Sequence, residues 1–199
     1  MKRLDIEPRV HGNGLIQIDL DRRVRVNVWS PLVPRQTIST PIHDHTFDFE
    51  STVICGTLIH KEYSVGKGDG EYQMYVSRPR VGEDTLLIRE TDSKYVAMLA
   101  RQIVLAEGDQ YSFRAGTFHE SVPSGLTATV MKKTAVSVRH ASRVLCLSSV
   151  EPDNAFNRHA FTSADLWEVV REALLEANKD VLDSVCSRLP IVKSLIEFF

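Results

Sequence analysis

Apolar and polar residues alternate with a period of two along much of the first 147 residues. The first such segments are residues 15–20 and 23–29, which are joined by an Asp-Arg pair. Because side chains alternate between the two faces of a strand, this pattern predicts a hairpin with one buried face. The valines of the second segment are expected to point inward, while its arginines face water. These valines are Val24, Val26 and Val28.

Further short segments rich in β-branched and aromatic residues follow, separated by glycine, proline or charged residues. Residues 51–55 and 58–65 flank Gly56. The sequence Gly-Lys-Gly-Asp-Gly at residues 66–70 predicts a tight turn, after which residues 71–77 return as the partner strand. Many short strands at this spacing predict a β-sandwich or barrel. The remaining candidate strands are residues 85–89, 95–105, 111–114, 127–132 and 143–147.

The pattern changes to helical spacing near residue 151. Thr162 and Asp165 fit a capping box, and apolar residues then recur every three or four positions in two stretches. The second stretch stops at Pro190, which can open a final short helix. About fifty residues would form only a marginal core alone. We therefore expect residues 1–150 to form a β-barrel domain and residues 151–199 to form a helical extension packed on it.

Composition limits the classes of function. The chain has 199 residues, a net charge of −2, and hydrophobic and charged fractions of 43% and 25%, which are ordinary for a globular protein. This charge gives no reason to expect binding to nucleic acid or to a membrane surface, and no apolar run is long enough to span a bilayer. Three irregularly spaced cysteines predict reduced thiols in a cytoplasmic protein.

Candidate chemistry is concentrated in two segments. His43 and His45 are two residues apart, so both project from the same face of an extended chain. Glu50 follows after room for a tight turn, and His119 comes far downstream after a turn bracketed by glycine. Three imidazoles and one carboxylate make a mixed nitrogen and oxygen site for a divalent transition metal. His43, His45, Glu50 and His119 are therefore the predicted metal ligands.

These segments resemble the two motifs of the cupin superfamily, G-x5-H-x-H-x3,4-E-x6-G and G-x5-P-x-G-x2-H-x3-N. The histidine and glutamate spacing of the first motif is present, and Gly56 follows after five residues rather than six. Gly108, Gly116 and His119 fit the second motif. The other departures are the missing glycine before His43, and Arg114 and Pro123 in place of the proline and asparagine.

The resemblance covers residues 15–147 and implies a mainly β fold, the cupin double-stranded β-helix barrel, with a C-terminal α-helical extension. It also implies a metal near the open mouth of the barrel. Two alternatives stay open from the residues themselves. In the first, Glu50 lies behind the metal ligands or at the surface, and the site consists of three histidines. In the second, the barrel holds no metal.

The local sequence is also similar to the thiol dioxygenases within the cupins. Those enzymes carry a tryptophan, then His-Asp-His, then a glycine and a strand that ends in an aromatic residue. Trp29, residues 43–45, Gly56 and Tyr63 stand in that order here. The thiol dioxygenases follow the third histidine with a strand bearing His-x-Tyr, and residues 127–133 contain neither residue. A related oxygenase with a different substrate therefore fits better than thiol oxidation.

We accordingly predict a metal-dependent enzyme, specifically a non-haem iron dioxygenase that acts on a small organic substrate in the barrel. Fe(II) is the expected metal, with Zn, Mn or Ni as alternatives. Two other functions remain: a non-redox isomerase or epimerase that uses the metal as a Lewis acid, and a module that binds a small ligand without turnover. No catalytic residue beyond the ligands is assigned.

Two secondary interpretations concern His60, Glu62 and the C-terminus. His60 and Glu62 share the strand parity of Glu50 and line the cavity if Gly56 introduces no bulge; the competing interpretation is a solvated face. The apolar residues 191–199 are expected to cover their own domain, with a homodimer contact as the alternative.

Overall fold

The computed structural model describes residues 6–35, 41–80, 83–136, 141–152 and 160–199. Within these residues, an antiparallel sheet of eight strands and three C-terminal helices confirm the predicted mainly β class. The strands are β1 (Arg9–His11), β2 (Leu15–Asp19), β3 (Val24–Trp29), β4 (Phe47–Arg80), β5 (Glu83–Leu105), β6 (Gln110–Phe113), β7 (Phe118–Val136) and β8 (Arg143–Leu147). The helices are α1 (Ser163–Glu176), α2 (Lys179–Arg188) and α3 (Pro190–Ile196).

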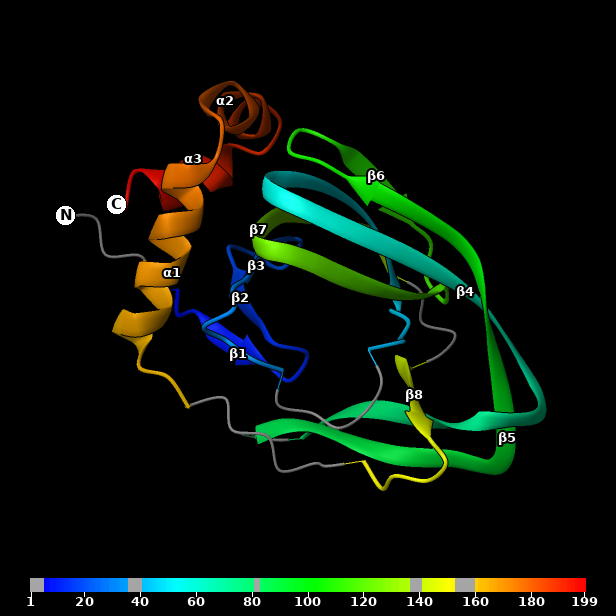
Figure 1. Ribbon diagram of the computed structural model, residues 1–199. Helices are drawn as coiled ribbons and strands as arrows, with labels where there is room; N and C mark the ends of the chain where they lie inside the picture. The colour runs from blue at the N-terminus through cyan, green and yellow to red at the C-terminus, as the bar shows by residue number, and fades with distance from the viewer. Residues whose placement is uncertain (1–5, 36–40, 81–82, 137–140, 153–159) are drawn as a thin grey trace.

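The strands pair in the order β1-β2-β3-β7-β4-β5, and β6 and β8 both pair with the long strand β4. The helices lie along one side of the molecule next to β1, β2 and β3, whereas β4 and β5 curve around the opposite side (Figure 1). The first half of β4 pairs with β6 and β7, and residues 72–76 pair with β8. The sheet therefore folds into two facing layers, and the space between them is called the interior below.

The predicted hairpin at residues 15–29 is confirmed as β2 and β3, with Ile16 opposite Val28. The β3 valines are buried, but they face the helices and share one apolar cluster with residues such as Val170 and Leu195. The alternate positions of β3 face the interior. Arg25 is only 16% exposed and pairs with Asp19, so the prediction that the arginines of this strand face water was wrong for Arg25.

The predicted hairpin turn at residues 66–70 is a bulge within β4. Lys67 and Tyr72 both lie opposite Tyr95, and the chain reverses only between Arg80 and Glu83. Residues 71–77 therefore pair with β5 and β8, and not with residues 58–65 as predicted. Glycines suit tight turns and bulges equally well, because both require backbone that other residues adopt poorly.

A second irregularity, at Gly56, reverses the face of β4 that points into the interior. Val53 and Leu58 lie on opposite sides of Gly56 in the sequence and differ in parity, yet they pack in the same apolar cluster. Gly56 has a φ of +74°, and a Cβ atom built there would lie 2.2 Å from the Leu126 carbonyl oxygen. Only glycine therefore fits at this point, and the register of β4 shifts on both sides of Cys55.

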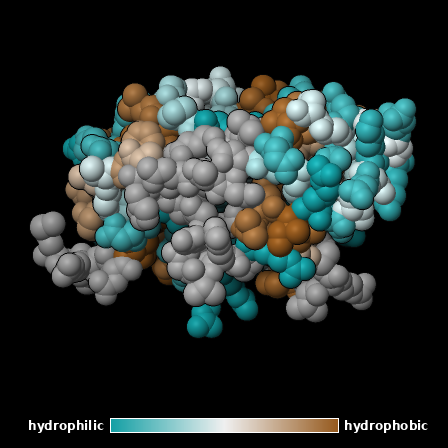
Figure 2. All heavy atoms as spheres, turned by 90° about the horizontal axis from the view of Figure 1, so that it is seen from below, coloured by the Kyte–Doolittle hydropathy of each residue, from teal (hydrophilic) through white to brown (hydrophobic). Residues whose placement is uncertain are grey.

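The C-terminal helices cover the outer face of β2, β3 and β7. The capping box at the start of α1 is confirmed. The Thr162 side chain accepts a hydrogen bond from the Asp165 backbone N–H, and the Asp165 side chain accepts one from the Thr162 backbone N–H. Pro190 occupies the first turn of α3 as predicted. Buried residues of all three helices join the largest apolar cluster, which lies between the helices and the sheet rather than in the interior. On the face seen in Figure 2, apolar side chains gather in separate patches among polar ones.

A partly buried ion pair attaches the segment that carries His43 and His45 to the first residue of β8. The Asp44 side chain is 0% exposed, and its Oδ2 accepts from Nε and Nη2 of Arg143 at 2.7 and 2.5 Å. The Arg143 backbone N–H donates to Asp44 Oδ1 at 2.6 Å, and the Asp44 N–H donates to the Arg143 carbonyl oxygen at 2.9 Å. Both charges of the pair are thus hydrogen-bonded, which a buried ion pair requires.

Replacing Asp44 with alanine is expected to lower the free energy of unfolding by about 2–3 kcal/mol, because the Arg143 guanidinium and backbone N–H both lose their acceptor. The loss is smaller than for a fully buried pair, since the Arg143 side chain is 27% exposed. Urea unfolding followed by circular dichroism measures this loss. The control is Asp183→Ala, which removes an exposed pair with Lys179 and is expected to cost less than about 1 kcal/mol. Equal losses in the two variants would contradict this account of the pair.

Candidate metal centre

The two histidine segments lie side by side through reciprocal backbone hydrogen bonds. The His43 N–H donates to the His119 carbonyl oxygen at 3.1 Å, and the His119 N–H donates to the His43 carbonyl oxygen at 2.9 Å. His43 also forms a bridge with Val144 of β8. The Gly116 N–H donates to the His45 carbonyl oxygen at 2.9 Å, which holds the turn before His119 against the same segment. Residues far apart in sequence are thus fixed as direct neighbours.

The imidazoles of His43, His45 and His119 converge on one position. One ring nitrogen from each lies within 4.8 Å of the other two, and the ring centroids are 4.6 to 5.0 Å apart. Nitrogen ligands about 2.1 Å from one ion are spaced by roughly 3 to 3.5 Å. Small rotations of the side chains are therefore sufficient to place the three nitrogens around a single cation.

Hydrogen bonds behind the rings select the tautomer that a metal needs. Nδ1 of His43 lies 2.7 Å from the Pro41 carbonyl oxygen, and Nδ1 of His119 lies 3.1 Å from that of Thr117. Because a carbonyl oxygen only accepts, each Nδ1 carries the proton and each Nε2 is left with a free lone pair. The His45 ring is held by stacking on Phe47, with centroids 4.8 Å apart.

The environment keeps all three imidazoles neutral at neutral pH. Burial lowers the pKa of His43, and it lowers the pKa values of His45 and His119 well below the ordinary value of 6.5. Repulsion from His43 lowers the pKa values of the other two further. Neutral imidazole is the form that binds metals, so the donor set suits a divalent transition ion.

Glu50 does not lie with the histidines. Its side chain is exposed on β4, opposite Ser112 and Lys132, and it is not a member of the three-residue group. The physical reason is parity, because Phe49 takes the inward position and its ring lies 6.2 Å from that of His119. The next residue of the strand must then point to the other face. The geometry thus corresponds to the alternative of a site with three histidines.

The positions of His60 and Glu62 depended on whether Gly56 introduces a bulge, and they differ from each other in exposure. Gly56 does introduce a bulge, and this bulge turns His60 toward the interior while Glu50 faces outward. His60 is only 1% exposed. Its ring lies 4.2 Å from that of Phe113 and 5.6 Å from that of His119. Glu62 is 26% exposed and pairs with Arg101 at 3.1 Å. The positive φ of Gly56 decides these positions, and a glycine inside a β-branched strand was the only signal of it in the sequence.

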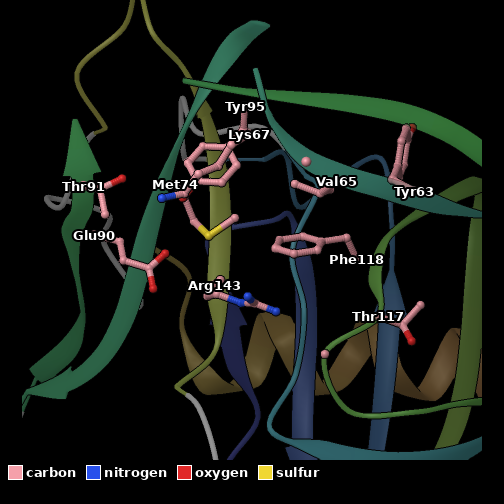
Figure 3. A pocket seen from close by; sticks show the side chains of 12 residues that line it. Tyr63, Val65, Lys67, Met74, Glu90, Thr91, Tyr95, Thr117, Phe118 and Arg143 are labelled. Atoms are coloured by element: carbon pink, nitrogen blue, oxygen red, sulfur yellow. The ribbon is translucent and has the colours of Figure 1, made fainter. Parts of the chain in front are cut away.

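A separate hollow lies on the other side of the turn that precedes His119. It has a volume of about 680 Å³, and it includes the turn residues 116–118 but none of the three histidines. Met74, Tyr95, Phe118 and Arg143 surround it (Figure 3). The Arg143 guanidinium also lies 4.8 Å from the centroid of the Phe118 ring. The residue that holds Asp44 therefore also forms part of the wall of this hollow.

The comparisons with known proteins give weak similarities. No protein-family model matches the sequence, and no curated protein matches it. A targeted domain of a protein of unknown function from Vibrio parahaemolyticus is 15% identical, with 64% of this chain and 97% of that chain covered and a TM-score of 0.36. The Drosophila melanogaster CENP-C cupin domain is 12% identical, with coverages of 65% and 76% and a TM-score of 0.35.

A hydroquinone 1,2-dioxygenase in complex with Cd2+ and 4-hydroxybenzonitrile is 16% identical over 59% of this chain, with a TM-score of 0.34. The match spans 63% of that dioxygenase chain. In the part of the chain that the structure describes, no helix combines the length and apolar character needed to cross a membrane.

Replacing His43 or His119 with alanine is expected to weaken metal binding more than about 100-fold, which exceeds the loss usually caused by removing a hydrogen-bond partner of a ligand. Glu50→Gln is the matched control and is expected to leave the metal content unchanged, because Glu50 is exposed and lies outside the cluster. Elemental analysis and competition with a chelator measure both effects. Loss of metal in Glu50→Gln would restore the carboxylate to the ligand set.

The metal-free protein is expected to lose stability as the pH falls from about 6.5 toward 4. Burial lowers the pKa of His60 to about 4 in the folded state, so the unfolded chain binds more protons in this range and its population rises. The stabilisation is therefore complete above pH 6.5 and is lost on acidification, by up to about 3 kcal/mol for this residue. Urea unfolding of wild-type protein and His60→Phe across this range tests the prediction. A pH dependence that is unchanged in His60→Phe would contradict it.

Proposed function

We propose that this chain is a cupin-type metal enzyme in which His43, His45 and His119 bind one divalent metal ion. The observation that supports this proposal is the convergence of three neutral imidazoles, two of them with Nδ1 engaged by a carbonyl oxygen. Bound Fe(II) would have positions left for both dioxygen and a substrate, which is the basis of non-haem dioxygenase chemistry. We infer a dioxygenase that incorporates oxygen into a small organic molecule.

The surroundings of the histidines suit a substrate with an apolar body. The rings of Phe47, Phe49 and Phe113 contact one or more of the three imidazoles, with centroid distances of 4.7 to 6.2 Å. These rings limit the access of water to the histidines and offer flat apolar surface beside them. The chain's own contribution in this proposal is to hold the ligands, exclude water and orient the substrate.

The three-histidine set also favours a second candidate function. Some catalytic zinc sites consist of three imidazole ligands and a fourth position that stays open for water or substrate, and the metal there acts as a Lewis acid. A non-redox isomerase or epimerase would use the metal in this way. Mn or Ni would also accept imidazole ligands, so the metal preference separates the candidates.

Several finer expectations accompany this proposal as predictions. The three cysteines are free thiols in the structure, which supports a reducing, cytoplasmic location. The division into a barrel domain at residues 1–150 and an extension at residues 151–199 is retained, since the helices bury their apolar faces on the sheet. We expect a small-molecule partner and neither nucleic acid nor membrane. The burial of Val192 and Leu195 against the sheet supports a C-terminus that covers its own domain rather than a homodimer contact.

Protein loaded with Fe(II) is expected to consume oxygen when one member of a panel of small acids, thiols, diketones and hydroxylated aromatic compounds is added. An oxygen electrode measures the uptake, and mass spectrometry with 18O2 tests for incorporation into the product. The reason is that only a redox-active ion with open positions couples oxygen to a substrate. His119→Ala is expected to reduce the uptake to background, and Glu50→Gln serves as the control that retains it.

Each outcome of this experiment decides between the candidates. Turnover with Zn2+ or Mn2+ that is indifferent to oxygen would replace the dioxygenase with the Lewis-acid enzyme. Absence of stoichiometric metal in wild-type protein, both as purified and after addition of Fe(II) or Zn2+, would overturn both enzymes and favour a module that binds a small ligand.

A further inference from the structure

His60 is a buried imidazole with no hydrogen-bond partner for either ring nitrogen among the residues that the structure describes. Its side chain is almost fully enclosed, at 1% exposure. Neutral imidazole offers one donor and one acceptor, and an unpaired buried polar group destabilises a fold. A phenylalanine would fill similar space among the same neighbours without that cost. The imidazole at this position therefore calls for an explanation other than packing.

The location of His60 points to the metal centre. His60 lies on the interior face of β4, opposite Ser121 of β7, two residues along that strand from His119. Its ring and the His119 ring both contact Phe113, at 4.2 and 4.7 Å. The Tyr111 ring also contacts the His60 ring, with centroids 5.4 Å apart. The unpaired nitrogens thus lie in the same aromatic surroundings as the third proposed metal ligand.

We propose that His60 is a further functional residue of this centre, and that it hydrogen-bonds a small anionic or oxygen-bearing ligand bound beside His119. The bond is made by the ring N–H, either directly or through one enclosed water molecule. This proposal rests on the proposed metal site, since the ligand would lie beside the histidines that hold the ion. His60 is not a fourth metal ligand, because it is not among the residues whose donor atoms converge within 4.8 Å.

The apolar neighbours of His60 limit the kinds of ligand that fit beside it. Ile103, opposite His60 on β5, and Tyr111, whose ring contacts that of His60, both pack against an apolar cluster. The members of this cluster are Leu15, Trp29, Val53, Leu58 and Leu105. A ligand that approaches from the histidines would therefore meet mainly apolar side chains and the imidazole of His60. The chemical class that fits is a small molecule or anion with an electronegative atom at the end that enters first.

The test uses azide as the probe and full-length protein loaded with Co(II), whose visible absorption reports both metal coordination and azide binding. His60→Phe is expected to keep one Co(II) per chain but to raise the azide Kd roughly five- to tenfold, the effect of losing one hydrogen bond. His60→Gln retains a side-chain N–H donor and is expected to recover part of the affinity. Tyr111→Phe is the matched control on the same wall and is expected to leave the Kd unchanged.

A second measurement needs no metal. At pH 8, where the imidazole is neutral in both folded and unfolded chains, metal-free His60→Phe is expected to melt at the same temperature as wild-type protein or higher, because an unpaired polar group has been removed. A residue kept for structure would instead lower the melting temperature on replacement. If His60→Phe does not fold, His60→Gln and His60→Leu replace it in both measurements. The azide Kd of His60→Gln is then expected to lie between those of wild-type protein and His60→Leu.

The outcomes separate this proposal from the proposed function. Co(II) bound normally with an azide Kd unchanged in His60→Phe or His60→Leu would overturn the role of His60 and leave the metal site standing. Wild-type protein that binds Co(II) but no azide would likewise overturn the role of His60. Failure of wild-type protein to bind Co(II) at all would overturn both proposals.

Discussion

The candidate centre depends on the reciprocal backbone hydrogen bonds between His43 and His119, which make two distant segments adjacent strands at one point. In an extended segment, His43 and His45 must face one way and Asp44 the other. The ion pair of Asp44 with Arg143 therefore fixes the orientation of both histidines from the opposite face. Neither interaction involves a metal, so contacts within the chain alone bring the three histidines together.

The main apolar core lies apart from the interior that holds the histidines, which makes polar groups in that interior compatible with a stable fold. The largest apolar cluster lies outside the facing layers, between the sheet and the C-terminal helices. The interior is then free to hold groups that a hydrophobic core excludes, such as His60, His119 and the amide of Asn27, which bonds Thr129. Burial of the helices thus supplies stability that the interior does not have to provide.

Much of the architecture was predictable, because its signals are local. The β2–β3 hairpin follows from alternation, the start of α1 from Thr162 and Asp165, and the start of α3 from Pro190. The three histidines were found from their spacing and from a resemblance to a known motif. The errors arose where non-local contacts decide. Gly56 forms a bulge because the Leu126 carbonyl oxygen approaches it, and the sequence around Gly56 contains no sign of that neighbour. The inward position of Phe49, and with it the exposure of Glu50, follows from pairing with β6 and β7.

The continuous run of β4 from Phe47 to Arg80 has a consequence for how this protein can diverge in evolution. Surface loops tolerate insertions, but this strand contributes side chains to both layers. Between its bulges, successive side chains alternate between the inner and outer faces. One residue gained or lost between Gly56 and His60 would exchange the inner and outer faces of that stretch. Relatives with the same site are therefore expected to vary in this stretch only by even numbers of residues, or by pairs of indels that cancel.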